Sequence, residues 1–348
     1  MSGTVAILGA GAMGSALATP LRTAGAEVRL WGTWLDDHLL AACREGRPHP
    51  RTNVELAGGT VLHPSDELEQ ALDGADTVVL AVASVGAVRV IELALPHMGA
   101  AQRLLLTSKG FDPDGEGRVR LLPEALRAAA EAAGHALPPI VAVGGPCKAN
   151  EVAAGRWTAA IFASLDESVA REAVRGAQTD VYRAAVSDDE VGVEVCAPMK
   201  NVYAIALGIA DGLSSLGGEP FHDLKAAAFA QSVQEMMLVT ERLGGDPMTA
   251  TGLAGAGDLE VTGLSGRNRL YGTRIGAGEQ ARAALVAMEA AELTVEGVPA
   301  ARFARSLIDQ RAPDLWAGLP LLAAILDVLD DAEEPGSRIA EAVLPPRV

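Results

Sequence analysis

A glycine-rich turn near the start of the chain constrains the fold more than any other feature of the sequence. Residues Thr4 to Leu8 are an apolar run that predicts a strand, and the turn GAGAMG follows at once, with glycines in the pattern GxGxxG. The residues after it have helical spacing. Such glycines let the backbone approach a pyrophosphate, which then lies at the positive N-terminus of the helix. We therefore expect a dinucleotide-binding turn, the alternative being a tight turn that only packs the helix. The residues expected to contact the cofactor here are Gly9, Gly11, Ala12, Met13 and Gly14.

Strand and helix patterns alternate up to Ser187, after which helical patterns dominate. Strands are expected at Glu27–Trp31, Thr60–His63, Thr77–Val82, Arg103–Thr107, Ile140–Val143, Thr158–Ala163 and Val181–Val186. Helices are expected at Asp66–Leu72, Gly86–Met98, Arg118–Ala133 and Glu167–Ala177, with a polar turn at Asp112–Gly117. Beyond Asp188 they are expected at Leu224–Leu243, Met248–Thr251, Arg267–Ala277, Glu279–Ala291, Val298–Asp309 and Trp316–Leu329. The sequence thus predicts an α/β fold: a Rossmann domain with a mainly parallel sheet over residues 1–187, then an all-α domain over residues 188–348.

The residues after the second strand bear on the choice of cofactor. An acid that would accept the ribose 2′-OH of NAD is missing from the stretch Trp31-Gly32-Thr33-Trp34. Asp36 and Asp37 come slightly later, and we expect them to start the next helix, with Asp36 near its N-cap. The sequence therefore favours NADP over NAD. The arginines that could reach a 2′-phosphate are Arg29, Arg44, Arg47 and Arg51, although surface arginines are usually just solvated.

The stretch Gly192 to Gly212 predicts a buried helix, because it is apolar on almost every side. Lys200 lies at its middle, where desolvating an ammonium costs several kcal/mol unless something compensates. Burial also lowers a lysine pKa from about 10.4 toward neutrality, where the amine can exchange a proton. We expect proton transfer by Lys200. The alternative is a structural ion pair with an acid such as Asp258.

Further candidates lie in turns and at helix ends. Lys109 follows the carboxyl end of a predicted strand, where open α/β sheets bind ligands. Asp258 and Thr262 are four residues apart and share a helix face. Arg267 and Asn268 open a helix after a glycine-containing turn, which favours an anion site. The alternative is a glycine-rich connection with a solvated arginine.

The amino-acid composition limits the kinds of binding partner that the chain is expected to have. Lys+Arg of 28 against Asp+Glu of 45 gives a net charge of −17, which argues against nucleic acid or an anionic membrane surface. An anionic ligand then needs a local cationic pocket. Cys43, Cys147 and Cys196 have neither disulfide nor zinc spacing, so we expect no metal and a cytoplasmic location. The most apolar run, Val202 to Ala210, is too short to cross a membrane.

Seven ordered motifs carry a resemblance over nearly the whole chain. They are GAGAMG, SKG at Lys109, GPxxA at Gly145–Ala149, KN at Lys200-Asn201, GDL at Gly257–Leu259, RN at Arg267-Asn268 and VEG at Val295–Gly297. Together they resemble the NAD(P)-dependent glycerol-3-phosphate dehydrogenase family, whose Rossmann domain precedes an all-helical domain of the 6-phosphogluconate dehydrogenase-like kind. The resemblance implies reversible reduction of dihydroxyacetone phosphate to sn-glycerol 3-phosphate in glycerol phosphate metabolism and phospholipid biosynthesis. It also allows a homodimer.

The resemblance also implies roles for individual residues. Lys200 would accept the proton in alcohol oxidation and donate it in ketone reduction, with Lys109 and Asp258 as catalytic neighbours. The residues expected around the substrate are Lys109, Gly145, Cys147, Lys148, Asn201, Thr262, Arg267 and Asn268. Beyond the glycine turn, those expected at the cofactor are Thr33, Lys109, Ala149, Arg267 and Glu296.

Several positions depart from the family pattern and bear on the substrate. They are Cys147 and Lys148 after Gly-Pro, Pro198 inside the Lys200 helix, Gly266 where serine is common, and Asp223 and Gln231 where asparagine and arginine are expected. Pro198 should kink its helix or remove one hydrogen bond. Two other functions therefore stay open: the same chemistry on a related phosphorylated or anionic hydroxyketone, and a non-catalytic NADP-binding sensor.

Overall fold

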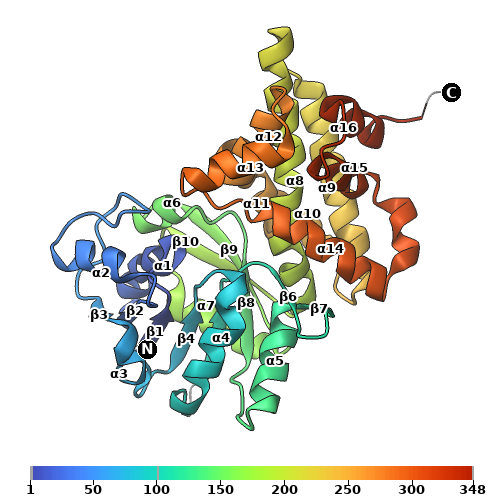
Figure 1. Ribbon diagram of the computed structural model, residues 1–348. Helices are drawn as coiled ribbons and strands as arrows, with labels where there is room; N and C mark the ends of the chain where they lie inside the picture. Colours follow the sequence, from blue (N-terminus) through green and yellow to red (C-terminus); the bar gives the residue numbers. More distant parts are fainter. Residues whose placement is uncertain (1–2, 100–101, 347–348) are drawn as a thin grey trace. The chain divides into compact units, whose positions relative to one another are not determined.

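The computed structural model describes residues 3–99 and 102–346, which divide into two compact units. The sheet unit comprises the residues up to Asp112 together with Leu121–Glu194, and the helical unit comprises Pro113–Arg120 and the residues from Val195 onward. In Figure 1 the sheet unit runs from blue to green, and the helical unit, apart from Pro113–Arg120, runs from yellow to red. Helix α8 (Glu190–Gly217) begins in the sheet unit and continues in the helical unit. The boundary proposed at Ser187 lies just before this helix.

A single mainly parallel sheet forms the centre of the sheet unit, as the alternating pattern predicts. Its strand order is β10-β9-β8-β5-β4-β1-β2-β3, and only β8 and β9 pair antiparallel. β1 lies between β4 and β2, so the direction of the strand order reverses beside it, and ligands of open α/β sheets bind at such a point. The strands are β1 (Thr4–Leu8), β2 (Glu27–Trp31), β3 (Val61–His63), β4 (Thr77–Leu80), β5 (Arg103–Leu106), β8 (Ile140–Gly144), β9 (Thr158–Ala163) and β10 (Tyr182–Ser187).

Successive strand residues point to opposite faces of the sheet, and each face has its own apolar core. Ile7 and Val79 belong to the core that includes α1 (Ala12–Thr23) and α7 (Glu167–Ala177). Leu8 and Leu80 belong to the core that includes α3 (Leu68–Leu72), α4 (Ser84–Ala94) and α5 (Leu122–Ala132). Burial on both faces explains why the central strands β1, β4, β5 and β8 are largely apolar runs. The remaining short elements are α2 (Asp37–Arg44), η1 (Ser65–Glu67), η2 (Leu95–His97) and α6 (Ala149–Ala153).

The segment between β5 and α5 differs from its prediction. A helix expected over Arg118–Ala133 begins only at Leu122, because β6 (Phe111–Pro113) and β7 (Val119–Leu121) pair as a two-stranded sheet. The region expected to be a polar turn is thus part of a hairpin. Its far end is held within the helical unit, where the Val119 N–H donates to Gln310 Oε1 at 3.0 Å. Pairing with the neighbouring strand β6 overrode the helical pattern at the start of this segment.

The helical unit is built around α8, which is longer than the predicted Gly192–Gly212 helix. It also contains α9 (His222–Arg242), α10 (Met248–Thr251), the π-helix η3 (Leu253–Gly257), α11 (Asp258–Ser265), α12 (Arg267–Gly276), α13 (Ala281–Ala290), α14 (Gly297–Arg311), η4 (Pro313–Gly318), α15 (Pro320–Leu329) and α16 (Pro335–Val343). The helix predicted at Trp316–Leu329 is divided at Leu319, since Pro320 starts a new helix. Neither η3 nor α16 was expected.

Two contacts fix α8 among its neighbours. A Cβ atom on Gly208 would come 2.1 Å from the carbonyl oxygen of Arg269, so this glycine lets α12 approach α8 closely. On another side, the Tyr203 hydroxyl donates to Glu235 of α9 at 3.0 Å, and Glu235 also accepts from the backbone N–H groups of Leu321 and Leu322. Burial raises the pKa of the Glu235 carboxyl. α8 is therefore packed closely against α12 and hydrogen-bonded to α9.

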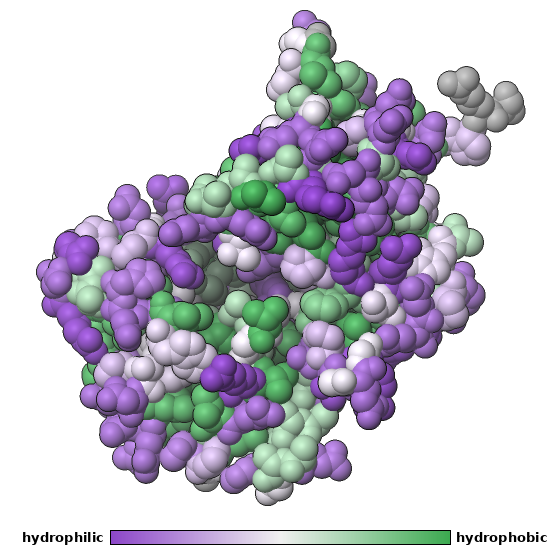
Figure 2. All heavy atoms as spheres, viewed as in Figure 1, coloured by the Kyte–Doolittle hydropathy of each residue, from purple (hydrophilic) through white to green (hydrophobic). Residues whose placement is uncertain are grey.

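Within the described residues, α8 alone is long and apolar enough to span a membrane, and its apolar stretch is wholly buried. The apolar run is thus longer than Val202–Ala210, and its environment is that of a core helix. The face of the molecule in Figure 2 is covered largely by hydrophilic residues, with separate apolar patches.

Candidate active site

Lys200 lies in a buried polar cluster of the helical unit. Its Nζ atom donates to Asp258 Oδ1 at 2.8 Å and to Thr262 Oγ1 at 2.7 Å. Asp258 and Thr262 lie one turn apart on α11, as their spacing predicts, and Lys200 is only 8% exposed. The carboxylate compensates the desolvation of the ammonium, and the hydroxyl fixes its direction. This cluster can hold an ammonium beside a reacting oxygen.

An amide network continues from Lys200 along α8. Asn201 Oδ1 accepts from Asn268 Nδ2 at 3.0 Å, and Asn268 Oδ1 accepts from the Gly297 N–H at 2.8 Å. A Cβ atom on Gly297 would come 2.4 Å from the Asn201 carbonyl oxygen, so only glycine fits there. Both asparagines are buried. They tie the starts of α12 and α14 to the helix that carries Lys200.

Arg267 is the first residue of α12, and its side chain is 48% exposed. Its Nη2 atom lies 3.7 Å from Glu296 Oε1, while Glu296 Oε2 is 3.5 Å from Asn201 Nδ2. The guanidinium is therefore only loosely paired and lies at the positive end of a helix. A small anion is the ligand that this arrangement favours.

In the sheet unit, the glycine turn joins β1 to α1 as predicted. Gly9 has φ +112°, and a Cβ atom there would come 2.8 Å from the Ala81 carbonyl oxygen. Gly11 is the N-cap of α1, and a Cβ atom on it would have Arg51 Nη1, at 3.8 Å, as its single neighbour within 4 Å among the described residues. The N-terminus of α1 thus faces open space, which fits a pyrophosphate group.

Asp36 lies at the N-cap of the next helix, as expected, but its side chain binds elsewhere. The helix after β2 begins at Asp37 with Asp36 as N-cap, but the Asp36 side chain makes no capping bond. Its Oδ2 atom instead accepts from the Thr33 N–H at 2.9 Å, from Thr33 Oγ1 at 2.8 Å and from the Ala10 N–H at 3.3 Å. The buried carboxylate thus binds Thr33 to the glycine turn. The Asp36 Oδ2 atom therefore already accepts hydrogen bonds from groups of the protein itself.

His49, which the sequence did not single out, fastens a loop to the same turn. Its Nε2 atom lies 2.9 Å from the Ala10 carbonyl oxygen, and its Nδ1 atom accepts from the Arg51 N–H at 3.2 Å. These two partners require a neutral ring protonated on Nε2. Burial lowers the pKa of His49, partly offset by its bond to Ala10. The result is that Arg51 is held beside Gly11.

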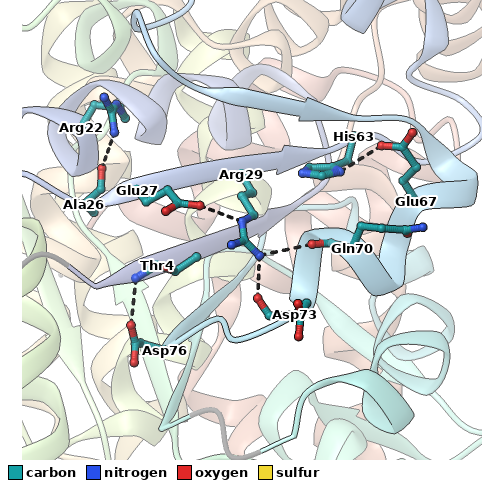
Figure 3. A network of polar contacts seen from close by, with 10 residues as sticks. All are labelled: Thr4, Arg22, Ala26, Glu27, Arg29, His63, Glu67, Gln70, Asp73 and Asp76. Carbon is teal, nitrogen blue, oxygen red and sulfur yellow. Dashed lines mark hydrogen bonds and ion pairs between the residues drawn. The ribbon is translucent and has the colours of Figure 1, made fainter.

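The four arginines named for a 2′-phosphate lie in different surroundings. Arg29 is committed to the fold: it donates to Glu27 and to the carbonyl oxygens of Gln70 and Asp73 (Figure 3). Arg47 pairs with Glu45 at 2.7 Å. Arg44 is an exposed residue in the last turn of α2. Arg51 is the one placed at the glycine turn.

Lys109 follows β5, as predicted, and lies near a buried acid. Burial raises the pKa of the Glu194 carboxyl, Glu190 raises it further, and the charges of Lys109 and Arg127 lower it. Glu190 itself pairs with Arg127 at 2.7 Å. Both Lys109 and Glu194 belong to the sheet unit. The ammonium of Lys109 therefore has an electrostatic partner within its own unit.

The turn after β8 holds the remaining candidates of the sheet unit. Gly145 has φ +105°, and a Cβ atom there would come 3.1 Å from the Ala159 carbonyl oxygen. The Cys147 thiol points to that same carbonyl, at 3.8 Å. Lys148 is the N-cap of α6, and Ala149 is its first residue. This short helix was not expected.

Two of the unusual residues have a local explanation. A Cβ atom on Gly266 would come 2.6 Å from the Thr262 carbonyl oxygen, so the turn between α11 and α12 is tight. Gln231 donates to Glu235 Oε1 at 3.0 Å and so helps to satisfy that buried carboxyl. Asp223 is exposed near the start of α9, and nothing in the structure explains it. Pro198 lies inside α8, and its predicted kink stays a prediction.

A parallel sheet with a glycine turn at its switch point, together with a buried lysine held by an acid, defines a class of protein. The class is the nicotinamide-dinucleotide-dependent dehydrogenases in which the protein supplies the proton. Residues 4–170 match the model of the NAD-dependent glycerol-3-phosphate dehydrogenase N-terminus, and residues 189–340 match the model of the C-terminus. The chain belongs to the NAD-dependent glycerol-3-phosphate dehydrogenase family. The resemblance and the fold predicted from the sequence are confirmed.

Similar proteins agree with this placement. The chain is 38% identical to the NADP(+)-dependent glycerol-3-phosphate dehydrogenase of Archaeoglobus fulgidus, over 79% of this chain and 80% of the relative. It is 35% identical to glycerol-3-phosphate dehydrogenase [NAD(P)+] of Symbiobacterium thermophilum, over 99% and 94%. Among solved structures, glycerol-3-phosphate dehydrogenase from Coxiella burnetii has a TM-score of 0.83 at 30% identity, with 98% of each chain covered. NAD or NADP is therefore the cofactor.

Proposed function

We propose that this chain reduces dihydroxyacetone phosphate to sn-glycerol 3-phosphate with a reduced nicotinamide cofactor, in a reversible reaction. The observation that carries the proposal is the buried contact of Lys200 with Asp258 and Thr262, in a chain that belongs to this family. A protein that only senses NADP has no need for such a contact. The proposal includes a cytoplasmic location and no nucleic acid or membrane partner.

In this proposal the glycine turn would hold the pyrophosphate of the cofactor, and the bound cofactor would supply the hydride. Arrival of a hydride at the carbonyl carbon leaves negative charge on the carbonyl oxygen, and Lys200 donates a proton to that oxygen. Asp258 compensates the charge of the ammonium before the transfer, and Thr262 holds its direction. Lys200 then recovers a proton from water. Oxidation of the alcohol reverses these steps.

We assign the anionic end of the substrate to Arg267, because its loosely paired guanidinium lies at the start of α12. Asn201 and Asn268 would then keep that helix start in register with Lys200. Contact of the substrate with Lys109, Gly145, Cys147 and Lys148 stays a prediction, as do the cofactor contacts of Ala149 and Glu296. A homodimer is likewise a prediction.

We also propose that NADP is preferred over NAD. Asp36, the acid nearest to the predicted ribose position, is occupied by Thr33 and Ala10. Arg51, held by the His49 loop beside Gly11, is a cation that can pair with a 2′-phosphate. The sequence left four arginines as candidates for contact with the 2′-phosphate. The position of Arg51 beside Gly11 favours Arg51 among them.

The purified protein should oxidise NADPH on addition of dihydroxyacetone phosphate and should form sn-glycerol 3-phosphate. Dihydroxyacetone should react far less well, because it has no phosphate group to bind Arg267 and so lacks the binding energy of that contact. Equal rates with both ketones would overturn the assignment of a phosphate site. Turnover of a different anionic hydroxyketone in preference to dihydroxyacetone phosphate would favour the related-substrate alternative, and tight NADPH binding without turnover would favour the sensor.

A further inference from the structure

The Tyr182 hydroxyl is a buried polar group that the fold leaves without a partner. Tyr182 begins β10 and is only 3% exposed, and its side chain belongs to the apolar core that includes α1 and α7. Within the described residues, its Oη atom makes no hydrogen bond. Most buried hydroxyls do make one, because a polar group that leaves water without a new partner costs free energy. The Tyr182 hydroxyl therefore calls for a ligand or a chemical group that the unmodified chain lacks.

The side chain that acts on this hydroxyl is Cys147. Burial raises the pKa of Tyr182 well above its ordinary value, and the adjacent Cys147 side chain raises it further. Strand pairing explains why the two residues meet. The Cys147 Sγ atom lies 3.8 Å from the carbonyl oxygen of Ala159 on β9. Tyr182 lies opposite Thr158 of the same strand. The thiol and the hydroxyl therefore lie next to each other at the carboxyl end of β8, the strand that leads into the Gly145 turn.

The three cysteines differ in how readily they can react. The thiolate form of a cysteine is the nucleophile, so burial in apolar surroundings suppresses reaction. Cys196 is fully buried in α8, and burial raises the pKa of the Cys43 thiol. Cys147 is half-buried, lies at the ligand-binding edge of the sheet, and has beside it the Tyr182 hydroxyl, a donor that can stabilise charge on sulfur. Cys147 is therefore the cysteine best suited to chemical modification.

We propose that Cys147 is a site of reversible oxidation by hydrogen peroxide, and that the Tyr182 hydroxyl holds the sulfenic acid formed there. The Cys147 sulfur attacks one peroxide oxygen, so that an S–O bond forms, the O–O bond breaks, and the second oxygen leaves as hydroxide. The thiol proton and this hydroxide form water. Sulfur is oxidised and the peroxide is reduced. The oxygen added to sulfur is a hydrogen-bond acceptor, and it gives the Tyr182 hydroxyl the partner that it lacks in the reduced chain.

Oxidation at this position should stop the activity reversibly. Cys147 follows Gly145 in the turn predicted to lie at the substrate, and an added oxygen makes its side chain larger and more polar. The loss of activity rests on the proposed function, whereas formation of the sulfenic acid does not. Reversal needs a thiol reductant. One thiol displaces the sulfenic oxygen as water to give a mixed disulfide, and a second thiol then releases the Cys147 thiol.

The test compares the unchanged chain with the variants Cys147→Ser, Cys43→Ser and Tyr182→Phe. Cys147→Ser keeps a small side chain but removes sulfur, and Cys43→Ser is the matched control because it removes the other half-buried thiol. Tyr182→Phe deletes only a hydroxyl that has no hydrogen-bond partner, so it should fold with an unchanged or higher Tm. Each protein is treated with a small excess of hydrogen peroxide. Dimedone, which adds to sulfenic acids and not to thiols, then marks the oxidised residue for mass spectrometry.

We expect the dimedone mass on Cys147 in the unchanged chain and in Cys43→Ser, and no labelled peptide in Cys147→Ser. Peroxide should lower the rate of dihydroxyacetone phosphate reduction by roughly 10-fold to 100-fold, the effect of a small displacement of a bound substrate. Dithiothreitol should restore the rate, and Cys147→Ser should keep its own rate throughout. In Tyr182→Phe the sulfenic acid should form but should persist about twofold to tenfold less long, because it loses one hydrogen bond.

Absence of dimedone from Cys147, or equal labelling of Cys43, would overturn the inference. An equal lifetime of the sulfenic acid in Tyr182→Phe would overturn the role of the hydroxyl, and a labelled chain that kept its full rate would overturn the effect on activity. None of these results touches the proposed function, provided that the untreated chain reduces dihydroxyacetone phosphate. An untreated chain without that activity would overturn the proposed function, while the labelling of Cys147 could still be read by mass.

Discussion

The carbonyl oxygen of Thr262 lies 2.6 Å from the point where a Cβ atom on Gly266 would stand. This distance is too short for a real contact, so a side chain at Gly266 must displace Thr262 or the turn between α11 and α12. Thr262 is also one of the two groups that hold the Lys200 ammonium. The small residue that departs from the family pattern is therefore linked to the candidate proton donor through one threonine.

Gly266→Ser should for this reason lower both activity and stability. Overpacking of a tight site typically costs about 1–3 kcal/mol, and movement of Thr262 should lower kcat several-fold while the Kd of NADPH stays the same. Thermal unfolding and steady-state kinetics measure the two effects. Gly266→Ala serves as the matched variant, because it adds the Cβ atom without a hydroxyl. An unchanged Tm and kcat in both variants would show that the turn relaxes freely.

His49 should make the stability of the protein depend on pH. Its pKa in the folded protein is lowered below the ordinary value of 6.5, so below about pH 6.5 the unfolded chain binds a proton that the folded chain does not. The stability contributed by the neutral ring is fully present above that pH and is lost as the pH falls toward the folded pKa. Each pKa unit between the two states corresponds to about 1.4 kcal/mol.

The Tm of the unchanged protein should therefore fall more steeply between pH 8 and pH 5 than that of His49→Gln, in which no ring titrates. The exposed His97 offers a matched control, since His97→Gln should keep the steep slope of the unchanged protein. If the Tm of His49→Gln and the Tm of the unchanged protein fell in parallel with pH, the His49 ring would not be the cause of the loss of stability.

Arg51→Ala should weaken NADPH far more than NADH. Loss of a hydrogen bond to a charged group costs about 1.5–3 kcal/mol, which corresponds to roughly tenfold to 150-fold in the KM of NADPH. Arg44→Ala, at the end of α2, is the control and should leave both cofactors unaffected. A similar loss for both cofactors would assign Arg51 to the shared pyrophosphate and would contradict its role in the preference for NADP.

Arg267→Ala should raise the KM of dihydroxyacetone phosphate by roughly tenfold to 150-fold, because it removes a charge-assisted hydrogen bond to the phosphate. Dihydroxyacetone, which has no phosphate, should react with the variant about as well as with the unchanged enzyme. Arg274, on the same helix, is paired with Glu279 at 2.7 Å, and Arg274→Ala should leave the KM near normal. Equal losses for both ketones would show that Arg267 acts on the helix and has no contact with the phosphate.

Local patterns were sufficient to predict the parts of the site that depend on local spacing. The GxGxxG turn predicted the join of β1 and α1, and the separation of Asp258 and Thr262 predicted their common helix face. The apolar surroundings of Lys200 in the sequence predicted its burial. In each case the information lies in nearby residues: a glycine at a fixed offset, a spacing of four residues, or a continuous apolar stretch.

Contacts between distant segments were missed because their partners cannot be read from a local pattern. The His49 loop meets Ala10 across a long stretch of chain, so nothing near His49 reveals the contact. Asp36 has the position of an N-cap, yet donors on Thr33 and Ala10 draw its side chain away from the helix. The β6–β7 hairpin was missed for a different reason: its strands are close in sequence, but each has only three residues, too few to show a strand period.

The central claim is that the Lys200 ammonium, held by Asp258 and Thr262, transfers the proton. The most direct test is the kcat of Lys200→Met for dihydroxyacetone phosphate at saturating NADPH, because methionine keeps the unbranched bulk of the side chain and removes the ammonium. We predict a loss of kcat of about 10² to 10⁴, with the Kd of NADPH close to that of the unchanged protein. The Tm should fall, because the buried Asp258 carboxylate loses the Lys200 ammonium that compensates its charge. A variant that retained nearly full turnover with an unchanged pH profile would show that Lys200 is structural and would contradict the proposed mechanism.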